Sequence, residues 1–309
     1  MNFEPVKLLP AFKDYLWGGT RLKTDYNKKT ELEKVAESWE LSAHKDGQSI
    51  VASGKDKGMS FGEYIKKNDV LGKNAKAFDF FPILIKFIDA KDNLSVQVHP
   101  DDEYALKNNG EYGKTEMWYV MDCDDGASLY FGFNRTLTKE ELKKRIEENT
   151  LLEVLNRVPV RKGDVFFIKS GTVHAIGKGI MICEIQQNSN TTYRVYDYNR
   201  KDKNGNTRPL HIERAIEVAD LKPAENVKFP GDVLASCKYF TVEKHDVSGS
   251  FRTAVTQDCF KSVIVLSGYG KLKYPSGELE FRKGDSLFVP AGCGEIEITG
   301  ECEIIISYV

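Results

Sequence analysis

One phrase occurs twice in this chain, and that repeat is the strongest constraint on its fold. Residues 161–171 read RKGDVFFIKSG, and residues 282–292 read RKGDSLFVPAG, 121 positions later. A repeated strand-turn-strand unit predicts two structurally similar halves. The first copy continues to His174, whereas the second continues to Cys293 and its neighbours, without a histidine. We therefore expect only one of the two halves to carry chemistry.

Length, charge and cysteine content exclude several classes of protein. A chain of 309 residues fits about two domains. Its net charge of −2 leaves no basic surplus for binding nucleic acid. The most apolar run, 80–88, contains Lys86 and is too short to span a bilayer. With no signal-peptide pattern at the N-terminus and no C-x-x-C pair among six cysteines, we expect a cytoplasmic protein with reduced thiols.

Short segments rich in β-branched and aromatic residues dominate the chain, separated by Gly, Asn and Asp. In the first half, strands are predicted at 83–88, 94–98, 117–121, 128–133, 164–168 and 180–185. In the second half, they are predicted at 239–244, 262–266, 271–274, 285–289, 295–298 and 302–308, with a turn at 267–270. This pattern fits a double-sheet jelly roll, the architecture that includes the cupins.

Helical patterns are few and lie in the first half. They begin at the capping-box residues Ser60 and Thr138 and at His211. Residues 221–232 carry two prolines and a glycine with little periodicity, as expected of a linker. We therefore predict a mainly β protein with two jelly-roll (cupin) domains, residues 1–225 and 233–309, and a few helices added to the first.

Polar residues that alternate along one predicted strand form the first part of a candidate site. In residues 94–100, Ser95, Gln97 and His99 share one face of the strand, and apolar residues share the other. Glu116 opens the next apolar strand, where an unpaired carboxylate would be costly. His174 follows the first copy of the repeat.

Gln97, His99, Glu116 and His174 together offer two nitrogens and two oxygens to a metal ion. That set suits a catalytic Zn²⁺ with an open position, and two histidines with one carboxylate also suit Fe²⁺. Arg194 lies in a stretch rich in aromatic and hydroxyl side chains, and its planar guanidinium suits phosphate or an enediolate oxygen.

Several motifs in order resemble the type I mannose-6-phosphate isomerases of the cupin superfamily, most closely their short bacterial form. They are SVQVHP (95–100), KTEMWY (114–119), GTVHA (171–175) and TTYRVYD (191–197), with LWGG (16–19) and ESWE (37–40) before them. The resemblance covers most of the first half. The second half resembles the family only in its general cupin character.

The resemblance implies a zinc-dependent exchange of mannose 6-phosphate and fructose 6-phosphate through an enediol(ate), with one zinc per chain. It implies Gln97, His99, Glu116 and His174 as ligands and Arg194 as the active-site arginine. Ser95 is a candidate for substrate binding. Such exchange also needs a positioned acid or base, for which Lys114 and Glu213 are the candidates.

Two other functions stay open: an iron-dependent cupin oxygenase and a non-catalytic cupin that binds sugar phosphates. We expect the partner to be a small-molecule sugar phosphate and the protein to be a monomer or homodimer. In the second half, Cys293 or a neighbour is expected at the place of His174 and Ser262 at that of Glu116. We therefore predict no metal site in that half.

Overall fold

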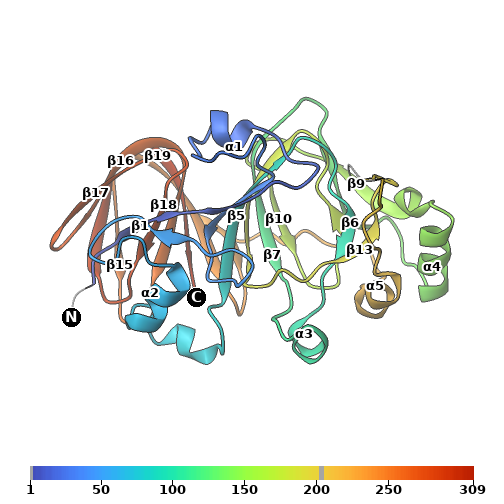
Figure 1. Cartoon of the computed structure of the whole chain (residues 1–309), viewed down its shortest axis with the longest axis horizontal. Coiled ribbons are helices and arrows are strands. Elements are labelled where there is room, and N and C mark those ends of the chain that lie inside the picture. Colours follow the sequence, from blue (N-terminus) through green and yellow to red (C-terminus); the bar gives the residue numbers. More distant parts are fainter. Residues whose placement is uncertain (1–2, 202–204) are drawn as a thin grey trace.

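The computed structural model describes residues 3–201 and 205–309 and arranges their strands in three sheets (Figure 1). A six-stranded sheet, in the order β10-β7-β12-β5-β3-β2, consists of β2 (Ala11–Lys13), β3 (Glu37–Leu41), β5 (Ile83–Ala90), β7 (Glu116–Cys123), β10 (Val165–Ile168) and β12 (Ile180–Gln187). A five-stranded sheet, in the order β13-β6-β11-β8-β9, consists of β6 (Val96–Val98), β8 (Ser128–Phe133), β9 (Leu155–Pro159), β11 (His174–Ala175) and β13 (Tyr193–Tyr196). The mainly β, cupin-type fold predicted from the sequence is confirmed.

The third sheet contains the whole second half of the chain and two strands of the first. Its members are β1 (Val6–Leu9), β4 (Ile50–Val51), β14 (Val233–Ser236), β15 (Thr241–Val255), β16 (Lys261–Tyr274), β17 (Gly277–Arg282), β18 (Ser286–Val289) and β19 (Gly294–Tyr308). Strand β1 pairs with β18 on one side and with β4 on the other. The N-terminal segment therefore completes the sheet of the second half, and the two halves are joined by strand pairing.

Five α-helices and two 3₁₀ turns lie among the described residues. They are α1 (Arg21–Thr24), α2 (Phe61–Lys67), α3 (Asp102–Asn109), α4 (Lys139–Glu147), α5 (Ile212–Val218), η1 (Asn74–Ala77) and η2 (Leu151–Val154). The three predicted helices are confirmed as α2, α4 and α5, and Ser60 makes the full capping box. Helix α3 was not predicted, although Asp101 caps its start and Gly110 ends it in the left-handed conformation. None of the helices in the described ranges is long and apolar enough to cross a membrane.

The six-stranded sheet is buried on both faces, which explains why β5 is an almost continuous apolar run. All eight of its residues are buried. Alternate side chains point to opposite faces of a strand. Ile85 and Phe87 belong to the core shared with the second half, whereas Ile88 belongs to the core between the six-stranded and five-stranded sheets. Lys86 therefore lies on the inner face of the first jelly roll, not on the surface.

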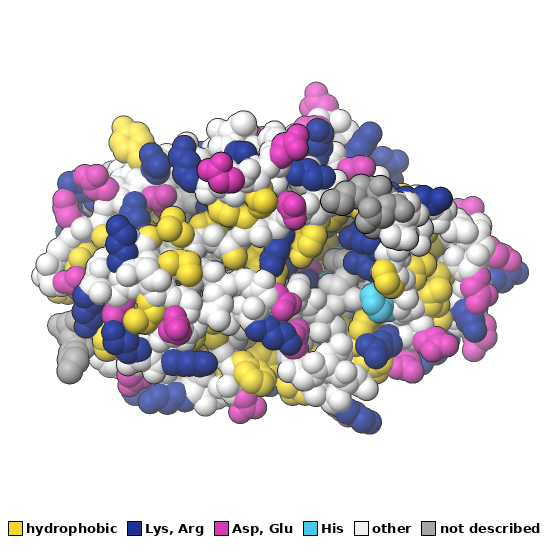
Figure 2. Space-filling model, viewed as in Figure 1, with side chains coloured by type: hydrophobic (Ala, Val, Ile, Leu, Met, Phe, Trp, Pro, Cys, Tyr) yellow, Lys and Arg dark blue, Asp and Glu magenta, His cyan; other side chains and the backbone are white. Residues whose placement is uncertain are grey.

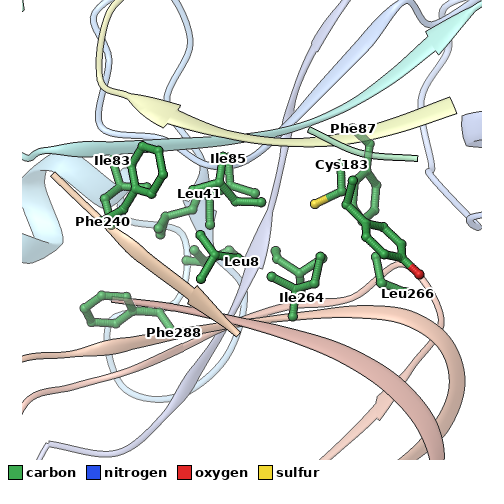
Figure 3. Close-up of a cluster of buried hydrophobic side chains, with 14 of the residues drawn as sticks. Leu8, Leu41, Ile83, Ile85, Phe87, Cys183, Phe240, Ile264, Leu266 and Phe288 are labelled. Carbon is green, nitrogen blue, oxygen red and sulfur yellow. The ribbon is translucent and has the colours of Figure 1, made fainter. Parts of the chain in front are cut away.

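A single hydrophobic core joins the two halves (Figure 3). Ile83, Ile85, Phe87 and Cys183 of the six-stranded sheet face Leu8, Ile264, Leu266 and Phe288 of the third sheet. The aromatic ring of Phe288 is fully buried, with its centroid 5.0 Å from that of Phe61 and 5.3 Å from that of Phe260. The second half is thus packed against the back of the sheet whose front face holds the candidate site.

The predicted turn at residues 267–270 is wrong. These residues continue β16, and the two segments predicted as strands on either side form one long strand with a register shift between Val265 and Ser267. Gly268 has φ = +77°, and a Cβ there would lie 1.9 Å from the carbonyl oxygen of Glu301. Glycine is needed at this position because the backbone bends and approaches its neighbour closely, not because the chain reverses.

Candidate active site

His99, Glu116 and His174 meet inside the first jelly roll, from segments far apart in the sequence. Glu116 begins β7 in one sheet, while His99 follows β6 and His174 begins β11 in the other. Their ligand atoms all lie within 4.8 Å of one another, and all three residues are buried. The Nε2 atom of His99 is 3.4 Å from Glu116 Oε1, and that of His174 is 3.7 Å from Oε2. The described residues hold no other group of His, Cys, Asp and Glu with this spacing.

Backbone carbonyl groups orient both imidazole rings. Nδ1 of His99 is 2.9 Å from the carbonyl oxygen of Thr191, and Nδ1 of His174 is 2.8 Å from that of Thr172. A carbonyl oxygen only accepts hydrogen bonds, so each Nδ1 carries the proton and each Nε2 presents a lone pair. Burial lowers the pKa of His174 to about 4 and holds that of His99 well below its usual value. Both rings are therefore neutral near pH 7, the form that binds metals.

The carboxylate of Glu116 is fully buried, and its Oε2 accepts no hydrogen bond. Lys114 Nζ lies 2.7 Å from Oε1, but burial and the nearby Glu184 outweigh it and raise the pKa of Glu116 to about 7. A buried carboxylate in this position is destabilised as an anion unless a cation faces it. A divalent cation held by Glu116 and the two Nε2 atoms would supply that charge. The donor set therefore fits a metal ion such as Zn²⁺ or Fe²⁺.

Gln97 and Lys114 lie directly beside His99, Glu116 and His174. The amide Nε2 of Gln97 is 3.4 Å from Nε2 of His174, and rotation of the amide would present its oxygen at the same point. Lys114 Nζ, 3.4 Å from Nε2 of His99, is buried with them. The structure therefore brings together all four residues predicted as ligands and one of the two predicted acid–base residues.

A cavity of about 360 Å³ adjoins this group and is lined by residues of both sheets, including Ser95, Gln97, Lys114 and Arg194. Ser95 and Arg194 contact each other, since the Nε of Arg194 donates to Ser95 Oγ at 3.1 Å. The predicted substrate-binding residues therefore share a cavity with Gln97 and Lys114, which lie against His174 and His99. Glu213, by contrast, is exposed in the first turn of α5 and is not among the residues lining the cavity.

Sequence reasoning missed a buried ionic cluster among the residues that line the same cavity. Lys86 Nζ lies 3.2 Å from Glu184 and 3.7 Å from Glu37, and all three line the cavity. The indole groups of Trp118 and Trp39 donate to Glu184 at 2.9 Å and to Glu37 at 2.7 Å. The signal was present in the sequence: a charged residue inside an apolar strand, as Lys86 and Glu184 are, is costly unless paired.

The charges of this cluster stabilise one another. Burial alone would lower the pKa of Lys86, but Glu37 and Glu184 outweigh it and raise that pKa. Burial would likewise raise the pKa of Glu184, but Lys86 and Lys114 lower it. The cavity therefore contains fixed charges of both signs in a largely dry wall, an arrangement suited to binding and polarising a polar substrate.

The corresponding position of the second half differs from the prediction. In the first half Ile168 pairs with Glu116, and in the second its repeat counterpart Val289 pairs with Lys261. Lys261, not Ser262, therefore occupies the place of Glu116. Its ammonium group donates to Thr253 Oγ1 at 2.6 Å and lies 5.4 Å from the ring centroid of Tyr308. A cationic side chain at this place opposes the binding of a metal ion.

The face of the molecule shown in Figure 2 carries acidic and basic side chains interspersed, in keeping with the net charge of −2.

Comparison with known proteins gives a uniform result. Residues 6–123 match the family model "Phosphomannose isomerase type I, catalytic domain", and residues 232–309 match "Mannose-6-phosphate isomerase, cupin domain".

The relatives match over essentially their whole length. Mannose-6-phosphate isomerase ManA of Bacillus subtilis is 42% identical over 318 aligned positions, covering 100% of both chains. Mannose-6-phosphate isomerase of Streptococcus mutans is also 42% identical, covering 99% of this chain and 98% of the relative. The crystal structure of a mannose 6-phosphate isomerase from Bacillus subtilis superposes with a TM-score of 0.91 at 35% identity, over 99% of this chain and 100% of that one. The chain belongs to the type I mannose-6-phosphate isomerase family.

Proposed function

We propose that the protein is a zinc-dependent isomerase that interconverts mannose 6-phosphate and fructose 6-phosphate. The observation that carries the proposal is the His99–Glu116–His174 group beside a cavity that also contains Lys114 and Arg194. Relatives of the same length, at 42% identity, are named for this activity. The choice of zinc rests on the donor set, with Gln97 as the fourth ligand, and one ion is expected per chain.

The residues around the cavity account for the requirements of aldose–ketose exchange. A bound metal ion polarises sugar oxygens. The remaining groups belong to the chain itself: Arg194 offers guanidinium N–H groups to the negative charge of the substrate, and Ser95 holds that guanidinium in position. Trp118 and Trp39 donate to the carboxylates of Glu184 and Glu37 and so orient these two residues of the cavity lining before substrate enters. The chain thus provides a preorganised polar site.

For proton transfer between the adjacent carbons, the geometry supports Lys114 over Glu213. Lys114 is buried and lines the cavity beside the ligands, whereas Glu213 is exposed outside it. A general acid or base must come within hydrogen-bond reach of the proton that it moves. Lys114 has that access, and Glu213 stays a weaker candidate.

Replacing Lys114 by methionine is expected to lower kcat by about 10²- to 10⁴-fold, the usual contribution of a positioned acid or base. Zinc content should be retained, because no ligand is removed. Steady-state kinetics and metal analysis of the same sample check both points. Lys107→Met, an exposed lysine of helix α3, is the control and should behave as wild type. A Lys114→Met variant with normal kcat would exclude Lys114 from proton transfer.

The proposed function is tested by a coupled assay for fructose 6-phosphate formed from mannose 6-phosphate. Activity should fall to background after chelation and return when zinc is added. Zinc-loaded protein without turnover would overturn the proposal and leave a sugar-phosphate-binding cupin. Consumption of oxygen by iron-loaded protein would instead support the cupin oxygenase.

Several broader features are part of the same proposal. We assign catalysis to the domain predicted over residues 1–225, and a supporting role to residues 233–309. All six cysteines are free thiols, which supports the expected cytoplasmic location. A monomer or homodimer stays the prediction for the oligomeric state.

A further inference from the structure

Three arginines gather around one buried carboxylate at the edge of the cavity. Arg208 makes a bidentate pair with Asp197, its Nε donating to Oδ2 at 2.7 Å and its Nη2 to Oδ1 at 2.6 Å. Arg200 also donates to Oδ1. Asp197 is only 6% exposed, and although burial raises its pKa, hydrogen bonds from Arg208 and Arg200 lower it on balance. Arg208 is thereby held in one orientation by a charged, largely dry contact.

The third arginine, Arg194, has no acidic partner of its own. Its side chain donates to two neutral oxygens, Oγ of Ser95 at 3.1 Å and the carbonyl of Pro209 at 3.0 Å. Within the described residues it makes no ion pair. Burial and the nearby Arg208 both lower the pKa of Arg194. The two guanidinium groups are thus close enough to repel each other.

Arg194 and Arg208 both line the cavity, whereas Arg200 is not among its lining residues. A guanidinium has five N–H donors, and the contacts above use two on each arginine. Three positive groups and one carboxylate leave a local excess of positive charge. Like charges held together at a cavity are unfavourable until an anion binds between them, and planar N–H donors suit a phosphate.

The backbone that positions this cluster is strained. Tyr198 and Asn199, between Asp197 and Arg200, both have left-handed backbones with φ of 55° and 52°. Two consecutive non-glycine residues rarely adopt this conformation, and such strain concentrates at binding and catalytic sites. The Arg200 guanidinium also lies 5.4 Å from the ring centroid of Tyr198. The ion pairs to Asp197 and the strained backbone together hold the arginines in fixed positions, as expected of a binding site.

We propose that Arg208, oriented by Asp197, is the residue that selects the phosphate monoester of the substrate, with Arg194 beside it as the second donor. The inference rests on the proposed function for the identity of the sugar phosphate. It adds a binding residue that lies outside the motifs carrying the family resemblance. Arg208 lines the same cavity as Lys114 and Gln97, and these two residues lie against His99 and His174 of the candidate metal site.

The test compares Arg208→Gln with wild type, using mannose 6-phosphate as substrate and inorganic phosphate as a competitive inhibitor. Loss of a charged hydrogen-bond donor to phosphate should raise both KM and the inhibition constant of phosphate by about 10- to 100-fold. The kcat should stay within about threefold, because Arg208 is not expected to act in the chemical step. Arg252→Gln is the control, since Arg252 is exposed on the second half and pairs with Glu297. Unchanged KM and inhibition constant, or a fall in kcat alone, would overturn the proposal.

Two further measurements keep the outcome decisive. Arg208→Lys retains the positive charge but not the planar guanidinium group. Its KM and its inhibition constant for phosphate should therefore lie between those of wild type and Arg208→Gln. If Arg208→Gln does not fold, the values for Arg208→Lys test the proposal. Calorimetric titration of the zinc-loaded protein with inorganic phosphate does not depend on turnover. Phosphate bound by wild type and not by Arg208→Gln supports the inference even if the isomerase assay fails. Normal isomerase activity with equal phosphate binding in both proteins overturns the inference alone.

Discussion

Replacing His174 by alanine is expected to remove bound zinc and to lower the turnover of mannose 6-phosphate by at least about 10³-fold. His174 supplies one of only two imidazole nitrogens in the group, and its Nε2 is fixed by the Nδ1 contact to Thr172. A catalytic metal ion contributes several kcal/mol to the stabilisation of charge in a transition state. Each 1.4 kcal/mol corresponds to about a tenfold change in rate. Metal analysis and the coupled assay on the same preparation measure the effect.

The matched control for this prediction is Glu295→Ala. Glu295 follows the second copy of the repeat, at the start of β19, and its side chain is exposed. Zinc content and kcat/KM should therefore stay near wild type. If Glu295→Ala abolished metal binding while His174→Ala did not, the site would lie in the other half.

Replacing Phe288 by alanine is expected to lower the free energy of unfolding by about 3–5 kcal/mol. The ring is completely buried in the core that joins the two halves (Figure 3). It contacts the rings of Phe61 in the first half and Phe260 in the second. Its removal takes away apolar contacts on both sides and leaves a cavity between rigid sheets. Chemical denaturation followed by intrinsic fluorescence measures the change.

Because the core is shared, the variant should unfold in one transition at a lower denaturant concentration, with both halves affected together. Tyr269→Ala is the control: that ring is 71% exposed, and surface changes usually stay within about 0.5 kcal/mol. Two separate transitions in Phe288→Ala, with activity persisting after the first, would show that the halves are stable independently.

Much of the first jelly roll could be predicted from local patterns. The alternation that placed Ser95, Gln97 and His99 on one face is a property of any strand. It is confirmed because Ser95 and Gln97 both line the cavity and His99 lies beside it with Glu116 and His174. Helices α2 and α4 were predicted because their caps are local hydrogen bonds between residues three apart.

The errors have a common origin in contacts between distant segments. Gly268 resembles a turn residue, but its neighbour is Glu301 on an adjacent strand, and that contact makes it a bend within β16. The prediction that Ser262 occupies the place of Glu116 was wrong by one residue. Strand register depends on the pairing partner, and the pairing with Val289 puts Lys261 at that place.

The sequence by itself determined the fold class, the repeat and the histidine that only the first copy leads to. Strand alternation and the repeat depend only on residues that are neighbours along the chain. Only the tertiary structure decided which side chains share the cavity. Lys86, Glu184 and Arg208 join the site through strand pairing and a folded loop, and no spacing along the chain encodes those distances. The sequence Arg-Lys-Gly-Asp is the same in both halves, but the strand that follows it pairs with different residues. Ile168 pairs with Glu116 in the first half, whereas Val289 pairs with Lys261 in the second. Only the first pairing places a carboxylate beside the histidine that follows the repeat.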